Sequence, residues 1–204
     1  MATSEDKCDL LKLSHDEVSI VTHELCDPLR PLLAVHLSST AKGLWVPMQE
    51  QLAELRPRHA EAAAMARAWG LSCAALADET ELWLGAEPLT LARWRTLGML
   101  VGCGSLPRLR ELDIWNDHNG DEGVASLADG LRRGRLPSLR ELCLINAQVG
   151  PRATALATAL TKRALPSLER LQLYDNQIGD AELAALAPAL RRLPTLKSLF
   201  LGYK

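Results

Sequence analysis

The stretch from Leu106 to Tyr203 contains one pattern three times and then begins it a fourth time. The copies read LPRLRELDIWNDHNGDEG, LPSLRELCLINAQVGPRA, LPSLERLQLYDNQIGDAE and LPTLKSLFLGYK. The leucines that follow the opening proline are 30, 29 and 28 residues apart: Leu109, Leu139, Leu168 and Leu196. A fixed period of this length predicts a stack of equivalent units, each of which buries its apolar side against its neighbours.

Each copy contains L-x-x-L-x-[LI], and the third adds an asparagine and an isoleucine, as in Leu168, Leu171, Leu173, Asn176 and Ile178. This pattern resembles the leucine-rich repeat, and the period of 28 to 30 residues looks like its long, ribonuclease-inhibitor-like subclass. The resemblance covers residues 79–204. It implies an α/β fold, a leucine-rich-repeat solenoid with a parallel concave sheet and convex helices.

Composition excludes several classes of protein. The chain has 204 residues, of which 48% are hydrophobic, enough for one extended domain or two small ones. Its net charge of −2 provides no overall field that would attract nucleic acid or anionic lipid. The first residues are too acidic and polar for a secretory or transit signal, and no run of 18 uncharged apolar residues suggests a membrane span.

The five cysteines are odd in number and scattered, without a C-x-x-C pair: Cys8, Cys26, Cys73, Cys103 and Cys143. This usage is typical of free thiols in a reducing compartment rather than of a disulfide framework. We therefore expect a soluble cytoplasmic or nuclear protein.

Residues 1–58 should form short helices ahead of the repeats. Ser14 to Glu17 is a capping box that predicts a helix starting near His15, and Asp27-Pro28 should break it. A second helical stretch follows Pro31, runs toward Gly43 and Trp45, and should end or bend at Pro47.

The order of residues in this segment is similar to the F-box. The matching positions are Leu13, Asp16-Glu17, Val18 to Leu25, Asp27-Pro28, Leu32 to Leu37 and Lys42 to Trp45. The segment departs from the family where Ser14 replaces the usual proline, where Ser39 to Ala41 replaces the usual valine–serine–basic step, and where Gly43 lies inside an expected helix. The resemblance implies docking on a Skp-type adaptor, with contacts from Leu13, Val18, Leu25, Pro28, Leu32 and Trp45.

A helical linker or N-terminal cap, residues 59–78, should join the two parts. The alanine-rich stretch from Glu54 to Trp69 predicts a helix that stops at Gly70. Its apolar stripe, formed by Ala62, Met65, Ala66 and Trp69, should seal the first repeat, because a stack of repeats needs atypical units at its ends.

A degenerate first copy should begin near residue 79, one period before Leu109, with Glu79 in a leucine position. Thr90 should begin its helix, which Gly102 to Gly104 should end. The later helices should span about 121–133, 151–163 and 180–192. Their expected terminal features are Asp121 and Asp180 as N-caps, Pro151 in a first turn, and a kink or early end at Pro188.

The strand pattern also predicts which side chains point away from the core. Leucines should point inward and the intervening residues outward, because successive side chains alternate across a strand. The outward positions are Glu81, Trp83, Gly85, Glu111, Asp113, Trp115, Glu141, Cys143, Ile145, Arg170, Gln172, Tyr174, Ser198, Phe200 and Gly202.

Four of the chain's eight aromatic residues fall in these 15 positions: Trp83, Trp115, Tyr174 and Phe200. Exposed aromatic side chains anchor protein interfaces, so this face is the predicted partner-binding surface. The acidic residues Glu81, Glu111, Asp113 and Glu141 suit a basic patch on a partner. The alternative is that aromatic residues occur here because they favour strands.

Sequence motifs for chemistry are missing. His23 and Cys26 are half of a zinc pattern without a second half, and Asp117, Asn119 and Asp121 lack the remaining ligands of a calcium loop. Phosphate-loop, dinucleotide and hydrolase motifs do not occur. Cys143 is a candidate reactive thiol, although nothing near it in sequence would lower its pKa. We expect no enzyme activity, no metal and no cofactor.

The last copy stops one strand into a new unit, from Leu199 to Lys204. Such an open edge should pack on a partner or belong to a longer array. The main hypothesis is a protein-recognition module, the substrate receptor of an SCF-type cullin–RING ubiquitin ligase with its client on the concave face. The alternative is a structural scaffold whose N-terminal helices only cap the solenoid.

Overall fold

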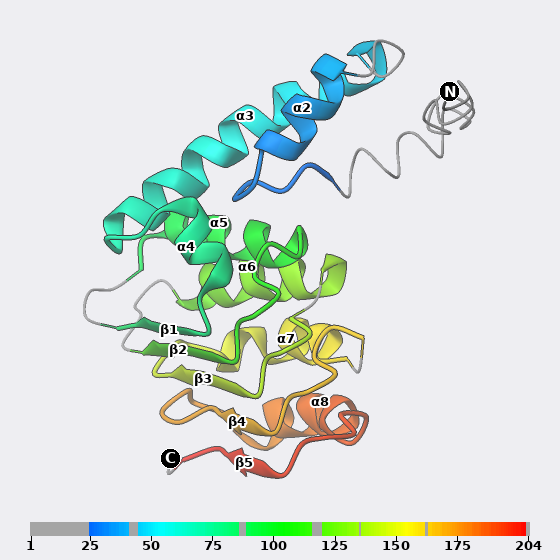
Figure 1. Ribbon diagram of the computed structural model, residues 1–204. Helices are drawn as coiled ribbons and strands as arrows, with labels where there is room; N and C mark the ends of the chain where they lie inside the picture. Colours follow the sequence, from blue (N-terminus) through cyan, green and yellow to red (C-terminus); the bar gives the residue numbers. More distant parts are fainter. Residues whose placement is uncertain are drawn as a thin grey trace.

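The computed structural model describes residues 25–40, 45–85, 89–115, 120–134, 136–161 and 163–202. Within these ranges the chain forms an α/β structure around a five-stranded parallel sheet, whose strands follow one another in sequence order (Figure 1). The strands are β1 (Glu81–Leu84), β2 (Glu111–Trp115), β3 (Glu141–Ile145), β4 (Arg170–Gln172) and β5 (Ser198–Phe200).

The repeat period sets the register of the sheet. Equivalent residues of successive copies lie side by side, as in the row Glu81, Glu111, Glu141, Arg170 and Ser198. The predicted inward residues are buried in one continuous core: Leu82, Leu84, Leu112, Ile114, Leu142, Leu144 and Leu171. The predicted direction of these side chains is therefore confirmed.

Helices cover one side of the sheet (Figure 1). They are α5 (Leu91–Gly102), α6 (Gly120–Arg133), α7 (Ala153–Ala159) preceded by the 3-10 turn η3 (Gly150–Arg152), and α8 (Asp180–Leu190). The predicted start of α5 is confirmed, because Thr90 is its N-cap and its hydroxyl accepts a hydrogen bond from the Arg93 backbone N–H at 3.3 Å.

Three predicted helix boundaries are wrong. Asp121 lies inside α6, and Asp180 is the first residue of α8, whose N-cap is Gly179. Gly179 has this role because its backbone N–H donates to the carboxylate of Glu182 at 2.9 Å. The third helix is shorter than 151–163, since the tight turn containing Pro151 delays its start and it ends at Ala159. The last helix passes through Pro188 and ends at Leu190, so it does not end at the proline as expected, although it stops before residue 192.

Three helices precede the sheet: α2 (Leu32–Thr40), α3 (Trp45–Ala68) and α4 (Cys73–Asp78). Pro47 does not end the second helical stretch, because α2 already stops at Thr40 and Pro47 lies in the first turn of α3, where its missing N–H costs nothing. The new helix also runs through Pro57 and across the expected boundary between residues 58 and 59. It ends before Gly70, whose positive φ of 71° supports the predicted stop.

Helix α3 covers the β1 end of the core (Figure 1). The predicted stripe is confirmed in this position, since Ala62, Met65 and Ala66 are buried in the same core as the leucines of β1, with Trp69 packed against it. Two polar contacts attach the chain just before α2 to α3 and α4. The His59 Nδ1 donates to the Pro28 carbonyl oxygen at 2.7 Å, and Arg30 pairs with Asp78 at 2.8 Å.

Several predictions lie outside the described residues: the helix starting near His15, the contacts of Leu13 and Val18, the role of His23, and the turn containing Asp117 and Asn119. The side chain of Trp45 belongs to the same group. Among the described helices, none is both long and apolar enough to cross a membrane.

Candidate functional site

The outward side chains of β1 to β5 form one surface, which we call the open face. It consists of Glu81, Trp83, Glu111, Asp113, Trp115, Glu141, Cys143, Ile145, Arg170, Gln172, Ser198 and Phe200, with Gly85, Tyr174 and Gly202 just beyond the strand ends. The helices lie on the opposite side of the sheet (Figure 1). The alternation of the strands therefore brings most of the predicted partner-binding residues onto one surface.

Aromatic side chains are exposed at both ends of the open face. Trp83 is 68% exposed and Trp115 44% exposed at the β1–β2 end, and Phe200 is 40% exposed on β5. The rings of Tyr174 and Phe200 are 5.8 Å apart with an angle of 31° between their planes. Such solvent-facing rings leave apolar area that a protein partner can bury.

Glycines beyond the strand ends give two of these rings their places. A Cβ atom built on Gly85 would lie 2.5 Å from the indole of Trp115, and one built on Gly202 would lie 2.9 Å from the ring of Tyr174. Both distances are shorter than van der Waals contact. Trp115 therefore lies flat across the end of β1, and its other side remains available to a partner.

The acidic residues predicted on this surface are adjacent. The sheet register places Glu111 beside Glu81 on one side and beside Glu141 on the other. The charge of Glu141 is compensated, since Arg170 Nε donates to it at 2.7 Å and Gln172 Nε2 at 2.5 Å. These hydrogen bonds, from Arg170 first, lower the pKa of Glu141.

Glu111 has the opposite environment. Burial, and then repulsion from Glu81, Glu141 and Asp113, raises the pKa of the Glu111 carboxyl above its ordinary value. The charge of Glu141 thus stabilises the fold and the charge of Glu111 destabilises it, because of the two only Glu141 has a cation beside it.

This contrast predicts opposite effects for the same substitution. Glu111→Gln should raise the melting temperature by about 2 °C at neutral pH, and Glu141→Gln should lower it by a similar amount. A raised carboxyl pKa removes stability as pH rises through it, whereas a lowered pKa removes stability as pH falls through it. Both differences from wild type should therefore shrink from about pH 7 to pH 4 in thermal unfolding followed by circular dichroism. Equal signs for the two variants would contradict this electrostatic description.

Cys143 differs from the expected accessible thiol. Its side chain points to the open face but is only 4% exposed, and Glu141 accepts from its Sγ at 3.6 Å. Burial, followed by the carboxylates of Asp113 and Glu141, raises the pKa of Cys143. The thiol therefore stays protonated and covered, with the carboxylates of Asp113 and Glu141 beside it.

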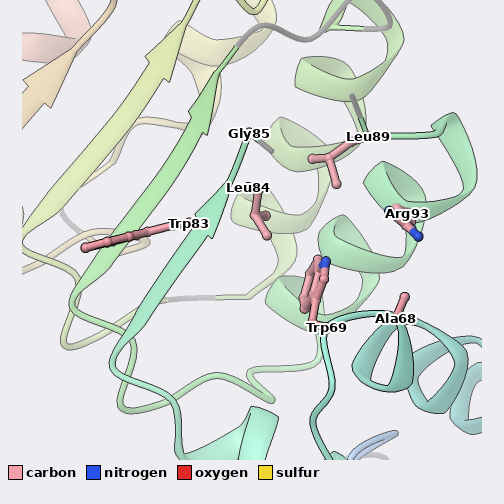
Figure 2. A pocket seen from close by; sticks show the side chains of 7 residues that line it. All are labelled: Ala68, Trp69, Trp83, Leu84, Gly85, Leu89 and Arg93. Carbon is pink, nitrogen blue, oxygen red and sulfur yellow. The ribbon is translucent and has the colours of Figure 1, made fainter. Parts of the chain in front are cut away.

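A cavity of about 240 Å³ adjoins the open face at the edge of β1. Figure 2 shows Trp83 directed away from β1 on one side, and Leu84, Leu89 and Trp69 grouped on the other, with Arg93 on the neighbouring helix. Apart from Arg93 the lining residues carry apolar side chains or none, but polar atoms contribute about half of the surface exposed in the cavity.

A second apolar surface lies on α2. Leu32, Leu33 and Val35 are 66%, 56% and 45% exposed, and we call them the α2 patch. Beside it, α2 and α3 form an apolar cavity of about 280 Å³, lined by Val35, Leu52, Leu55 and others. Of the residues predicted to contact an adaptor, Leu32 is exposed, Leu25 is half-buried, and Pro28 is buried against α3.

Leu33 and Val35 were not predicted as contact residues. A sequence signal for them exists, because LLAVHL has apolar residues at consecutive positions and a helix cannot turn all of them toward one core. Their exposure follows from this excess of apolar residues.

The described ranges contain no group of three or more histidine, cysteine, aspartate or glutamate side chains placed to hold a metal ion. The site residues with a described position offer carboxylates, an amide, a guanidinium and aromatic rings.

No family model matches this chain, and neither curated proteins nor solved structures give a match.

Proposed function

We propose that this chain is a protein-recognition module built from leucine-rich repeats, with a protein client bound on the open face. The observation that carries the proposal is the distribution of exposed apolar side chains in the described residues. Three of them, Trp83, Trp115 and Phe200, are aromatic residues on the open face. A monomer gains nothing by exposing large rings at both ends of one surface, whereas an interface uses them as anchors.

A second part of the proposal concerns the α2 patch. The module is the substrate receptor of an SCF-type cullin–RING ligase, and the F-box-like segment docks on a Skp-type adaptor through Leu32, Leu33 and Val35. This assignment is supported by the F-box-like order of residues and by the exposure of three apolar side chains on one short helix. A helix that only capped the repeats would bury them.

The scaffold alternative also has support. The segment before α2 is attached to the repeats, since Leu29 lies in the main core and His59 and Asp78 hold Pro28 and Arg30. On this alternative, α2 and α3 together form the end unit of the stack. The two alternatives differ in whether the α2 patch contacts another protein.

Binding to a purified Skp-type adaptor, measured by calorimetry, separates them. Wild type should bind, and Leu32→Asp should weaken binding at least about tenfold, because a carboxylate would be buried in the interface. The control is Leu183→Asp, which introduces the same change at an exposed leucine of α8. Equal binding by all three proteins favours the scaffold. So does the absence of binding by a wild-type protein whose circular dichroism spectrum shows that it is folded.

The open face needs its own test. Proteins captured from a cell lysate by wild type should be lost with the Trp83→Ala, Phe200→Ala double variant and kept with Leu183→Asp. The double variant should remain folded, since both rings are exposed. Capture that is identical for all three proteins would contradict client binding on the open face.

A further inference from the structure

The β1–β2 part of the open face has negative charge without a compensating cation. Glu81, Glu111 and Asp113 form no ion pair with a cation among the described residues, in contrast to Glu141, which pairs with Arg170, while the thiol of Cys143 lies beside the carboxylate of Asp113. Adjacent carboxylates on neighbouring strands repel each other, and burial followed by this repulsion raises the pKa of Glu111. These three carboxylates lie beside Trp83 and Trp115, and the repulsion between them lowers the stability of the fold.

Asp113 is the centre of this region. It lies directly beside Trp83 across the β1–β2 pair, and Trp115 follows two residues later on the same face. Neighbouring strands are about 4.8 Å apart and alternate residues of one strand about 6.6 Å apart, so both rings are within reach of its carboxylate. The Oδ1 atom of Asp113 is out of contact with solvent and accepts no hydrogen bond from the described residues. Asp113 as a whole is only half-buried, so a partner can approach its carboxylate from solvent although Oδ1 itself is covered.

We propose that this part of the open face binds an arginine of a basic segment in a protein partner, with the guanidinium held by Asp113 and Glu111 between the rings of Trp83 and Trp115. The inference rests on the proposed function, because it names the chemistry of the client on the same surface.

Arginine fits this arrangement better than other side chains. Its planar guanidinium donates in a fork to a carboxylate and stacks on an aromatic face, whereas lysine does only the first as a point charge. Trp115 is fixed over Gly85, so the stacking surface is formed before the partner arrives. Nucleic acid and anionic membranes are disfavoured, since their phosphates would face three carboxylates.

The other end of the open face has a different character. The Glu141–Arg170 pair separates the acidic end from Tyr174 and Phe200, where no carboxylate lies in the rows of β4 and β5. A client that crosses the sheet would thus place its basic residue at β1–β2 and an apolar residue at β5.

Fluorescence anisotropy with three labelled peptides tests the proposal on the full chain. The peptides carry three arginines, three citrullines or three lysines in the same glycine–serine background. The arginine peptide should bind at least about tenfold more tightly than the citrulline peptide and more tightly than the lysine peptide. Asp113→Asn should weaken arginine-peptide binding about tenfold and Trp83→Ala about fivefold. Glu50→Gln, which removes one charge on α3 away from the sheet, should change it less than about twofold.

Thermal unfolding of the same variants separates binding from stability. Asp113→Asn should melt at the same temperature as wild type or higher, since it removes a negative charge that repels Glu111, while the amide oxygen can still accept from the thiol of Cys143. If Asp113 had only a structural role, its replacement would lower the melting temperature instead. Loss of binding together with unchanged or higher stability is the expected result.

Three outcomes would overturn the inference: equal binding of the citrulline peptide, wild-type binding by Asp113→Asn, or an equal loss with Glu50→Gln. Failure here leaves the proposed function intact if the Trp83→Ala, Phe200→Ala variant still loses its captured proteins. If that variant loses none, the proposed function itself fails.

Discussion

Replacing Gly130 with alanine should destabilise this protein by about 3 kcal/mol. The substitution lies in the interior of α6, where alanine is the better helix former by about 1 kcal/mol, so local propensity predicts a gain. The contact with α5 reverses the sign. A Cβ atom on Gly130 would lie 2.2 Å from the Gly98 carbonyl oxygen, and one on Gly98 would lie 2.3 Å from the Ser126 carbonyl oxygen. Backbone atoms meet here, so the two helices must separate to admit a methyl group.

Gly102→Ala is the matched control. It lies in the same α5–α6 interface, but its nearest neighbours would be 3.6 Å or more from the new Cβ, which is ordinary contact. This variant should unfold at or slightly above the wild-type temperature, while Gly130→Ala should unfold about 10 °C lower. Circular dichroism melts of both proteins give the comparison. A Gly130→Ala melt at or above that of Gly102→Ala would show that the helices do not approach as closely as described.

Replacing Asn176 with alanine should lower the free energy of unfolding by about 3 to 4 kcal/mol, because its buried amide makes four hydrogen bonds. Its Oδ1 accepts from the backbone N–H groups of Ala147 at 2.8 Å and Val149 at 3.2 Å. Its Nδ2 donates to the carbonyl oxygens of Leu144 and Tyr174. The side chain therefore joins the turn after β4 to the turn after β3, and its loss leaves backbone groups of both turns unpaired.

Gln177→Ala provides the control for Asn176→Ala. Gln177 is the next residue, has a φ of 53° and is exposed, so its removal tests the turn without touching the buried amide. We expect a loss of less than about 0.5 kcal/mol, measured by urea unfolding. If the two variants lose the same stability, the bridge by Asn176 does not hold the copies together.

Part of this fold can be predicted from the sequence because it depends only on residues within one copy of the repeat. The alternation of leucines with other residues fixes which side of each strand is buried, since period 2 is a local property of strand geometry. Thr90 as a helix start and Gly70 as a helix stop are local as well, because each acts on backbone groups within one turn. These predictions needed only residues close together in the chain.

Helix boundaries were less predictable where several caps compete. Gly179 and Asp180 are both acceptable N-caps, and the carboxylate of Glu182 favours Gly179 by accepting a hydrogen bond from its backbone N–H. Pro47 is compatible with the end of one helix or the first turn of the next. The structure selects the second, since α3 begins at Trp45, and the other end of the same helix carries Ala62, Met65 and Ala66 into the core.

The sequence by itself determined the repeat period, the inward leucines and the set of side chains that share the open face. Only the tertiary structure decided how those side chains affect one another. The stacking of copies places Glu111 between two glutamates, gives Glu141 its arginine and covers Cys143. It also brings Gly98 and Gly130 into backbone contact. The physical reason is that period and alternation are properties of one chain segment, whereas charge compensation, burial and close approach depend on residues about 30 positions apart, whose distance is set only when the units pack.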